Sequence, residues 1–86
     1  MKELEKILKA LANKRRLAIL KYLKTKGEAS VGDITEEIEL SFKATSKHLN
    51  ILLAVDILEK EQRSSQIFYR LTSGQKPAAK HIIALL

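Results

Sequence analysis

Two short stretches of helical sequence, joined by only a few residues, most constrain what this chain can fold into. The first begins at Ser30, a favoured helix N-cap, and keeps apolar residues on one face as far as Ile38. The second follows another N-cap at Ser41 and runs from Phe42 to about Val55. Two short helices joined so closely form a helix-turn-helix unit, whose second helix can lie in the major groove of DNA.

A β-hairpin is predicted directly after these helices. Ile57 and Leu58 open a strand, polar residues form a turn over 62–66, and apolar and polar residues alternate over 67–72. The turn carries Arg63, whose cation can lie along a phosphate backbone or reach into a minor groove. A two-stranded hairpin at this position is called a wing.

Three further helices complete the expected fold. Residues 1–12 repeat apolar side chains at the spacing of one helical face, and Asn13 can cap a helix that ends at Gly27. Pro77 begins a last helix, which is apolar on several sides. A chain of 86 residues has room for one core. We therefore expect a single, mainly α domain over residues 1–86, a winged helix-turn-helix with five helices and a small two-stranded wing.

Composition and charge narrow the possible functions. The net charge is +6, which favours an anionic partner such as nucleic acid or an acidic membrane surface. No apolar run approaches the roughly 20 residues of a membrane-spanning helix, and no secretory signal is recognisable, so we expect a cytoplasmic protein. Without cysteine there is no disulfide, thiolate metal site or cysteine nucleophile, and no other constellation indicates an enzyme.

Three motifs of the chain resemble those of the ArsR-type winged-helix repressors. Residues 8–20 contain L-K-A-L-A-N and R-L-A-I-L, similar to the family's opening pattern L-K-A-L-A-D-x-x-R-L-x-I-L. Residues 41–52, S-F-K-A-T-S-K-H-L-N-I-L, are similar to its recognition helix, L-S-Q-x-x-V-S-x-H-L-x-x-L, and residues 68–71, F-Y-R-L, to its wing strand Y-Y-R-L. The family comprises bacterial and archaeal regulators, usually homodimers and often metal-responsive. The resemblance implies a sequence-specific, DNA-binding transcriptional repressor.

The chain departs from the family at its metal sites and at two turns. Ser30 and Gly32 stand where metal-sensing members have cysteines, and His81 alone in the last helix cannot hold a zinc ion, which needs four ligands. We therefore expect no metal and no cofactor. Asp56 and Ser64 stand where the family usually has glycine; because Asp tolerates left-handed backbone better than most residues, we expect the fold to be kept.

The second helix of the pair supplies the expected DNA contacts. Thr45, Leu49 and Leu52 turn inward, which leaves four polar residues outward for the groove: Lys43, Ser46, Lys47 and Asn50. Arg63 is a predicted phosphate contact, and His48 is either a structural histidine or a phosphate contact. Phe42 is expected to support the turn rather than to contact DNA. Two neighbours, Arg15 and Arg16, could contact phosphates or form a salt bridge.

A homodimer on a palindromic site is expected, because two recognition helices related by a two-fold axis enter successive major grooves about 34 Å apart. The resemblance places the dimer contact in residues 1–12 and 77–86, through Leu4, Ile7, Leu8, Ile82, Ile83 and Leu86. From the sequence alone, the apolar residues of the last helix could instead pack on the core of the same copy. Two other functions stay open. The fold also serves as a protein–protein interaction module, and a basic first helix could lie on a membrane, although the rest of the chain would then be unexplained.

Overall fold

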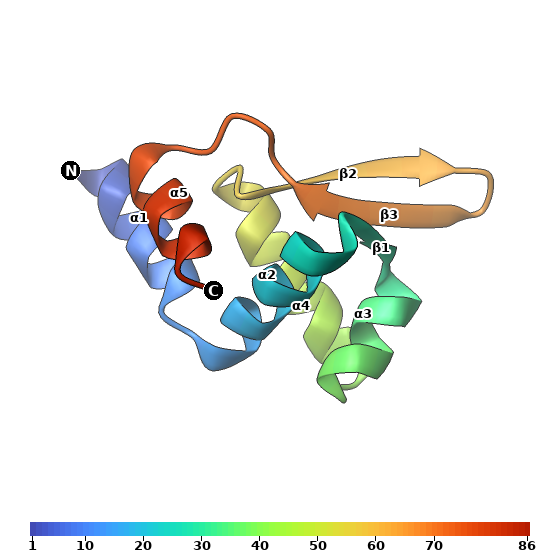
Figure 1. Ribbon diagram of the computed structural model, residues 1–86. Helices are drawn as coiled ribbons and strands as arrows, with labels where there is room; N and C mark the ends of the chain where they lie inside the picture. Colours follow the sequence, from blue (N-terminus) through green and yellow to red (C-terminus); the bar gives the residue numbers. More distant parts are fainter.

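Five helices and three strands make up the fold, and the computed structural model describes all 86 residues. Helices α1 (Lys2–Leu11) and α2 (Lys14–Lys26) precede strand β1 (Glu28–Ser30) and the closely joined α3 (Val31–Ile38) and α4 (Phe42–Ala54). Strands β2 (Leu58–Arg63) and β3 (Gln66–Leu71) and helix α5 (Pro77–Ala84) follow (Figure 1). The α3–α4 pair and the hairpin after it confirm the predicted winged helix-turn-helix.

The sheet has three strands, so the prediction of a two-stranded wing was wrong in this respect. Strand β3 lies between β1 and β2 and pairs antiparallel with both. In the β1–β3 pairing, Glu28 lies opposite Arg70 and Ala29 opposite Tyr69. Three residues are too few to show the alternation of a strand, and their partners lie far along the sequence. The third strand therefore depends on tertiary contacts that no local pattern records.

Side-chain caps begin three of the helices, as the sequence predicts. Asn13 Oδ1 accepts hydrogen bonds from two backbone N–H groups at the start of α2, at 2.9 and 3.1 Å. Ser30 Oγ accepts from the backbone of Asp33, at 3.2 Å, and Ser41 Oγ from that of Ala44, at 3.1 Å. Each cap pairs a donor that the helix itself leaves free. The two serine caps thus fix where both helices of the pair begin.

Two turns have left-handed backbone at the positions where the family has glycine. Asp56, between α4 and β2, has φ of 58°, and Ser64, in the wing turn, has φ of 56°. Residues with a Cβ adopt this region at a cost of roughly 1–2 kcal/mol. The turn shapes that glycine allows are therefore kept here by an aspartate, which tolerates left-handed backbone better than most residues, and by a serine, for which it is strained.

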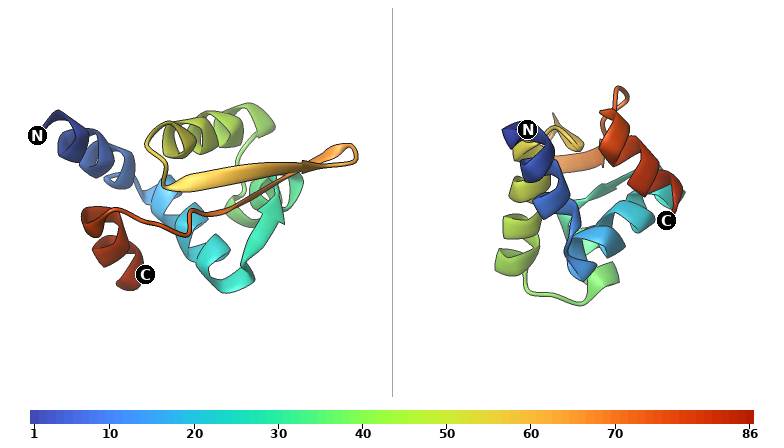
Figure 2. Two further views of the ribbon diagram at one scale, coloured as in Figure 1. Left: turned by 90° about the horizontal axis from the view of Figure 1, so that it is seen from above. Right: turned by 90° about the vertical axis from the view of Figure 1, so that its left-hand side faces the viewer.

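One hydrophobic core joins the helices to the sheet. It contains 16 buried residues, among them Ile19 and Leu20 of α2 and Leu49 and Leu52 of α4, none of which is exposed to solvent. Helices α1 and α5 lie side by side at the end of the molecule opposite the wing tip (Figures 1 and 2). None of the helices has the length and apolar character needed to span a bilayer. The α3–α4 pair, the wing and the α1–α5 end are therefore held as separate surfaces around one core.

Candidate nucleic-acid interface

The outward face of α4 brings together the four residues predicted to contact a DNA groove. The helix buries Thr45, whose hydroxyl donates to the Ser41 carbonyl at 2.9 Å, together with two leucines. The opposite face forms a shallow depression lined by Phe42, Lys43, Ser46, Lys47, Asn50, Ile51 and Ala54. In a major groove, lysines on such a face can donate hydrogen bonds to guanine, and an asparagine can pair with adenine.

The electrostatics of α4 suit an anionic ligand. No acidic residue occurs in the helix, and neither Lys43 nor Lys47 takes part in the five ion pairs of the structure. The helix N-terminus adds partial positive charge at the same end as Lys43, because the peptide dipoles align along the axis. This end of α4 therefore concentrates positive charge without a carboxylate to neutralise it.

His48 lies beside this face and packs toward α2. Its Nδ1 accepts a hydrogen bond from Nη1 of Arg16 at 3.2 Å, since a guanidinium can only donate. Burial lowers the pKa of His48 below its usual 6.5, and the nearby cations Arg16, Lys47 and Arg15 lower it further. The ring is therefore neutral at pH 7, with its proton on Nε2. It forms a structural link between α4 and α2, and its predicted contact with phosphate stays a prediction.

Arg15 and Arg16 bind backbone carbonyls at helix ends. Arg16 donates to the carbonyls of Ala10, at 2.5 Å, and Lys9, at 3.1 Å, which are among the last of α1. Arg15 donates to the carbonyl of Ile38, at 3.3 Å, at the end of α3. Cations at helix C-termini satisfy free carbonyls and complement the dipole. The structure therefore gives these arginines a structural role; neither forms a salt bridge, and their predicted phosphate contact stays a prediction.

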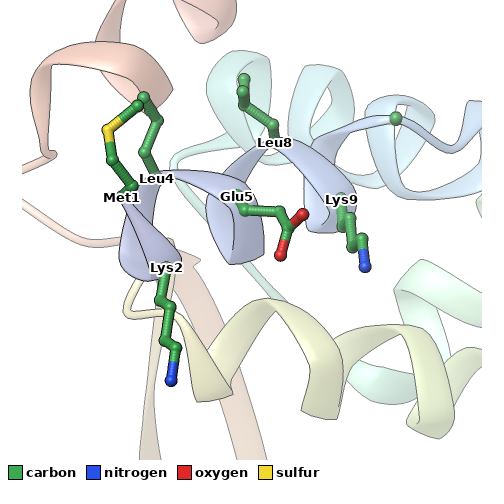
Figure 3. A pocket seen from close by; sticks show the side chains of 7 residues that line it. Met1, Lys2, Leu4, Glu5, Leu8 and Lys9 are labelled. Atoms are coloured by element: carbon green, nitrogen blue, oxygen red, sulfur yellow. The ribbon is translucent and has the colours of Figure 1, made fainter.

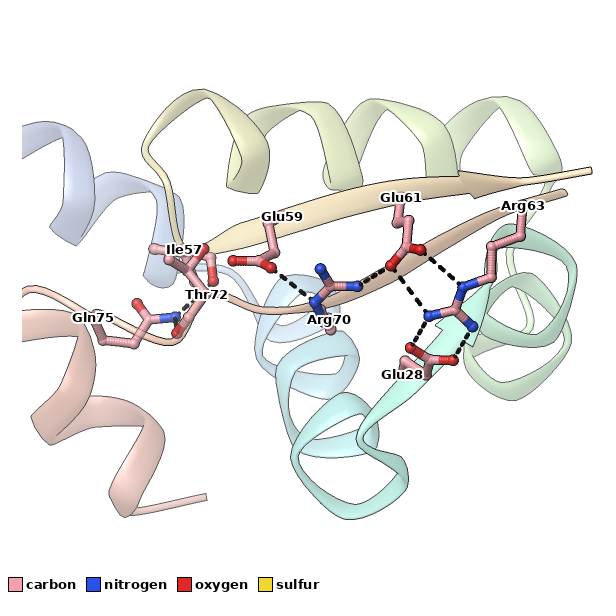
Figure 4. Close-up of polar contacts among 8 residues, drawn as sticks. All are labelled: Glu28, Ile57, Glu59, Glu61, Arg63, Arg70, Thr72 and Gln75. Carbon is pink, nitrogen blue, oxygen red and sulfur yellow. Dashed lines mark hydrogen bonds and ion pairs between the residues drawn. The ribbon is translucent and has the colours of Figure 1, made fainter.

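Arg63 is held within the wing by carboxylates. Its guanidinium donates to both oxygens of Glu28, at 2.5 and 2.8 Å, and to Glu61 at 3.2 Å (Figure 4). It also lies 4.8 Å from the ring centre of Phe68. These carboxylates raise the pKa of Arg63 above its already high value. Arg70 extends the network by binding Glu61 at 2.9 Å and a further carboxylate of β2. A DNA phosphate would have to compete with Glu28 and Glu61 for Arg63, whose predicted phosphate contact stays a prediction.

Phe42 lies on the surface at the start of α4, and its predicted role in supporting the turn stays a prediction. The side chain is 62% exposed and is absent from the apolar residues that pack against the core. Its ring lies instead at the N-terminal end of the depression on α4. Local sequence could not settle this, because an apolar residue at the start of a helix is compatible with either placement.

The residues predicted for a dimer contact divide into exposed and buried groups. Leu4 and Leu8 are 39% and 46% exposed, and they lie with Met1 on one side of α1, along a shallow apolar groove (Figure 3). Ile7 and Ile83 belong to the core and are only 3% and 8% exposed. The other two residues of the prediction, Ile82 and Leu86, are half-buried. The surface available to a second copy therefore centres on the two leucines of α1.

The chain offers no recognisable metal centre. No group of three or more His, Asp or Glu side chains is placed to hold a metal ion. Ser30, which stands where metal-sensing relatives have a cysteine, caps α3 instead. Its hydroxyl therefore has a structural task at the start of the helix pair.

Sequence comparison identifies the family. The profile of the family described as "Bacterial regulatory protein, arsR family" matches residues 13–60, more than half of the chain. The transcriptional activator HlyU of Vibrio cholerae is 39% identical over 72 residues, covering 84% of this chain and 66% of HlyU. The arsenical resistance operon repressor of Bacillus subtilis is 35% identical over 75 residues, covering 87% of this chain and 71% of the repressor. The chain thus spans about two thirds of the length of these relatives.

Solved structures agree with this assignment. Reduced HlyU from Vibrio cholerae superimposes with a TM-score of 0.82 at 37% identity, covering 98% of this chain and 84% of HlyU. A homodimeric winged helix-turn-helix DNA-binding domain from Mycobacterium bovis superimposes with a TM-score of 0.83 at 27% identity, covering 98% of this chain and 74% of that one. The chain belongs to the arsR family of bacterial regulatory proteins, and it carries the winged helix-turn-helix DNA-binding domain of a transcriptional regulator.

Proposed function

We propose that this protein is a homodimeric transcriptional repressor that binds a palindromic operator in the cytoplasm. The outer face of α4 contacts base edges through Lys43, Ser46, Lys47 and Asn50. Residues 1–12 and 77–86 hold two copies together. The protein acts by binding DNA and catalyses no reaction. The observation that carries the proposal is that α4 gathers these four donors on one acid-free face.

The remaining parts of the proposal rest on geometry and on the relatives. Two-fold symmetry places two copies of α4 in successive major grooves, which requires a palindromic site. The Bacillus subtilis relative is a repressor, and the Mycobacterium bovis domain is a homodimer. His48 and Arg63 are secondary contacts in this proposal, because each already has a partner within the protein.

Fluorescence-anisotropy titrations with random duplex DNA over a series of salt concentrations test the proposal. Affinity should fall steeply with salt, with a slope of about 0.9 for each phosphate neutralised. The variant Lys43→Ala/Lys47→Ala should bind more weakly and lower that slope. A control, Lys21→Ala/Lys26→Ala, removes the same charge from exposed positions on α2 and should change binding much less.

Two outcomes would contradict the proposal. A dimer that binds no duplex even at low salt would instead favour a protein–protein interaction module. Equal losses in the two double variants would show that only net charge matters, and that α4 is not the recognition helix. Selection of bound sequences from the random pool then gives the operator, whose two-fold symmetry is the next expected result.

A further inference from the structure

Phe42 is an exposed aromatic side chain that the fold does not use. Of the four aromatic residues of the chain, it is the only one on the exposed surface, at 62% exposure. Ser41 already caps α4 with its own side chain, so the helix start does not depend on the ring. A lone exposed apolar residue is unremarkable by itself. Its position beside the proposed DNA contacts is what indicates a function for this ring.

The ring lies in the same depression as the polar residues that we assign to the DNA groove. Phe42, Ser46 and Asn50 follow one another at four-residue intervals, which places them in one row along the helix. The rest of the lining includes Lys43 and Lys47 and no carboxylate. A protein partner for so cationic a face would have to be acidic, whereas DNA supplies both negative charge and an apolar group.

That apolar group is the C5-methyl of thymine. It is the one apolar feature that a base pair presents in the major groove, and phenylalanine is among the side chains that contact it. The first residues of a recognition helix are those that reach base edges, and Phe42 is the first residue of α4. A ring at this position cannot form the hydrogen bonds that distinguish guanine or adenine.

We propose that Phe42 is a specificity-determining residue that selects thymine in each half-site by contact with the C5-methyl group. This inference rests on the proposed function, because it requires α4 to lie in the groove. It also separates this chain from the recognition-helix pattern L-S-Q-x-x-V-S-x-H-L-x-x-L, in which glutamine stands where this chain has Phe42. Glutamine can pair with adenine, so the two residues would select different bases.

The test compares selected operator duplexes that contain thymine with the same duplexes containing uracil, which lacks only the methyl group. Wild-type protein should bind the uracil duplex about fourfold more weakly for each methyl contacted. Phe42→Ala should lose a similar factor on the thymine duplex and bind the thymine and uracil duplexes equally. Phe42→Gln should likewise bind the thymine and uracil duplexes equally, because an amide pairs with adenine through hydrogen bonds that do not involve the methyl group.

Lys43→Ala is the matched control on the same face. It should weaken binding and keep the wild-type preference for thymine over uracil. The inference alone is overturned if wild type does not distinguish the two duplexes, or if Phe42→Ala distinguishes them as wild type does. Absence of any duplex binding by folded wild-type protein overturns the proposed function as well. Thermal unfolding of each variant shows whether it is folded, and the exposed ring predicts little change.

Discussion

Arg63, at the end of β2, binds both carboxylate oxygens of Glu28, at the start of β1, at 2.5 and 2.8 Å. This bidentate pair joins the two edge strands of the sheet, β1 and β2 (Figure 4). It also places an anion beside the one cation of the wing turn. The wing is therefore ordered by a contact that at the same time reduces its attraction for a phosphate backbone.

Replacing Glu28 by Gln should strengthen non-specific DNA binding several-fold at low salt. The substitution removes a negative charge and frees part of the Arg63 guanidinium for a phosphate. Anisotropy titrations with random duplex measure the effect. Glu36→Gln is the control, because it removes the same charge from an exposed residue of α3 that has no ion-pair partner. An equal gain in both variants would show that Arg63 contributes nothing specific.

The stability of the protein should decrease as pH falls below about 6.5, because of His48. Burial and neighbouring cations lower the pKa of this imidazole below its usual 6.5 in the folded state. At a pH between the folded and unfolded pKa values of His48, the imidazole is protonated in the unfolded chain and neutral in the folded chain. The free energy of unfolding therefore rises with pH in this range. Urea unfolding at pH 5 and pH 7.5 measures the difference. His48→Gln should reduce this difference, whereas His81→Gln, at an exposed site, should not; an unchanged difference in His48→Gln would exclude this origin.

Leu8→Glu should convert the proposed dimer into a folded monomer. Leu8 is 46% exposed on the apolar side of α1, so a carboxylate there is tolerated in the monomer and costly in a dry interface. Sedimentation equilibrium gives the oligomeric state, and circular dichroism shows that the fold is retained. Phe42→Glu, which places the same charge at another exposed apolar position, should remain dimeric. A dimeric Leu8→Glu protein would place the interface elsewhere.

Ser64→Gly should raise the free energy of unfolding by about 0.5–1 kcal/mol, because the left-handed strain that it relieves outweighs the entropy that glycine adds to the unfolded chain. The φ of 56° at Ser64 is the observation on which this depends. Gly27→Ala is a control in the opposite direction. Gly27 has φ of 87°, so alanine there is strained and the variant should be about 1 kcal/mol less stable. Thermal unfolding, in which such changes shift Tm by a few degrees, compares the two. A fall in stability for Ser64→Gly would mean that the serine side chain stabilises the turn.

Zinc, cadmium and arsenite should leave DNA affinity unchanged. The chain has no cysteine, and Ser30 uses its hydroxyl to cap α3. Thiolates are the ligands that such soft ions prefer, and this chain has none to offer them. Anisotropy titrations with and without each ion are the measurement. A large loss of affinity with any of them would reveal a site built from other residues.

Local signals in the sequence predicted the helices and their starts. Ser30 and Ser41 act through hydrogen bonds to residues three positions away, so the sequence itself contains both partners. β1 was missed because its hydrogen bonds go to β3, far along the chain. The same long-range pairing brings Glu28 to Arg63, which explains why Arg63 was expected to be free. The position of the Phe42 ring was likewise not encoded locally.

Arg16 binds the last carbonyls of α1 and, through the same guanidinium, the ring of His48 on α4. In the proposed dimer, α1 sets the distance between subunits and α4 enters the groove. Because Arg16 joins the two helices, the dimer interface also sets the distance and orientation of the two copies of α4. One base pair inserted between the half-sites increases their separation by about 3.4 Å and rotates one relative to the other by about 35° around the duplex. The contacts of Arg16 with both helices oppose such a turn of α4, so the spacing between half-sites should affect binding as well as the bases within them.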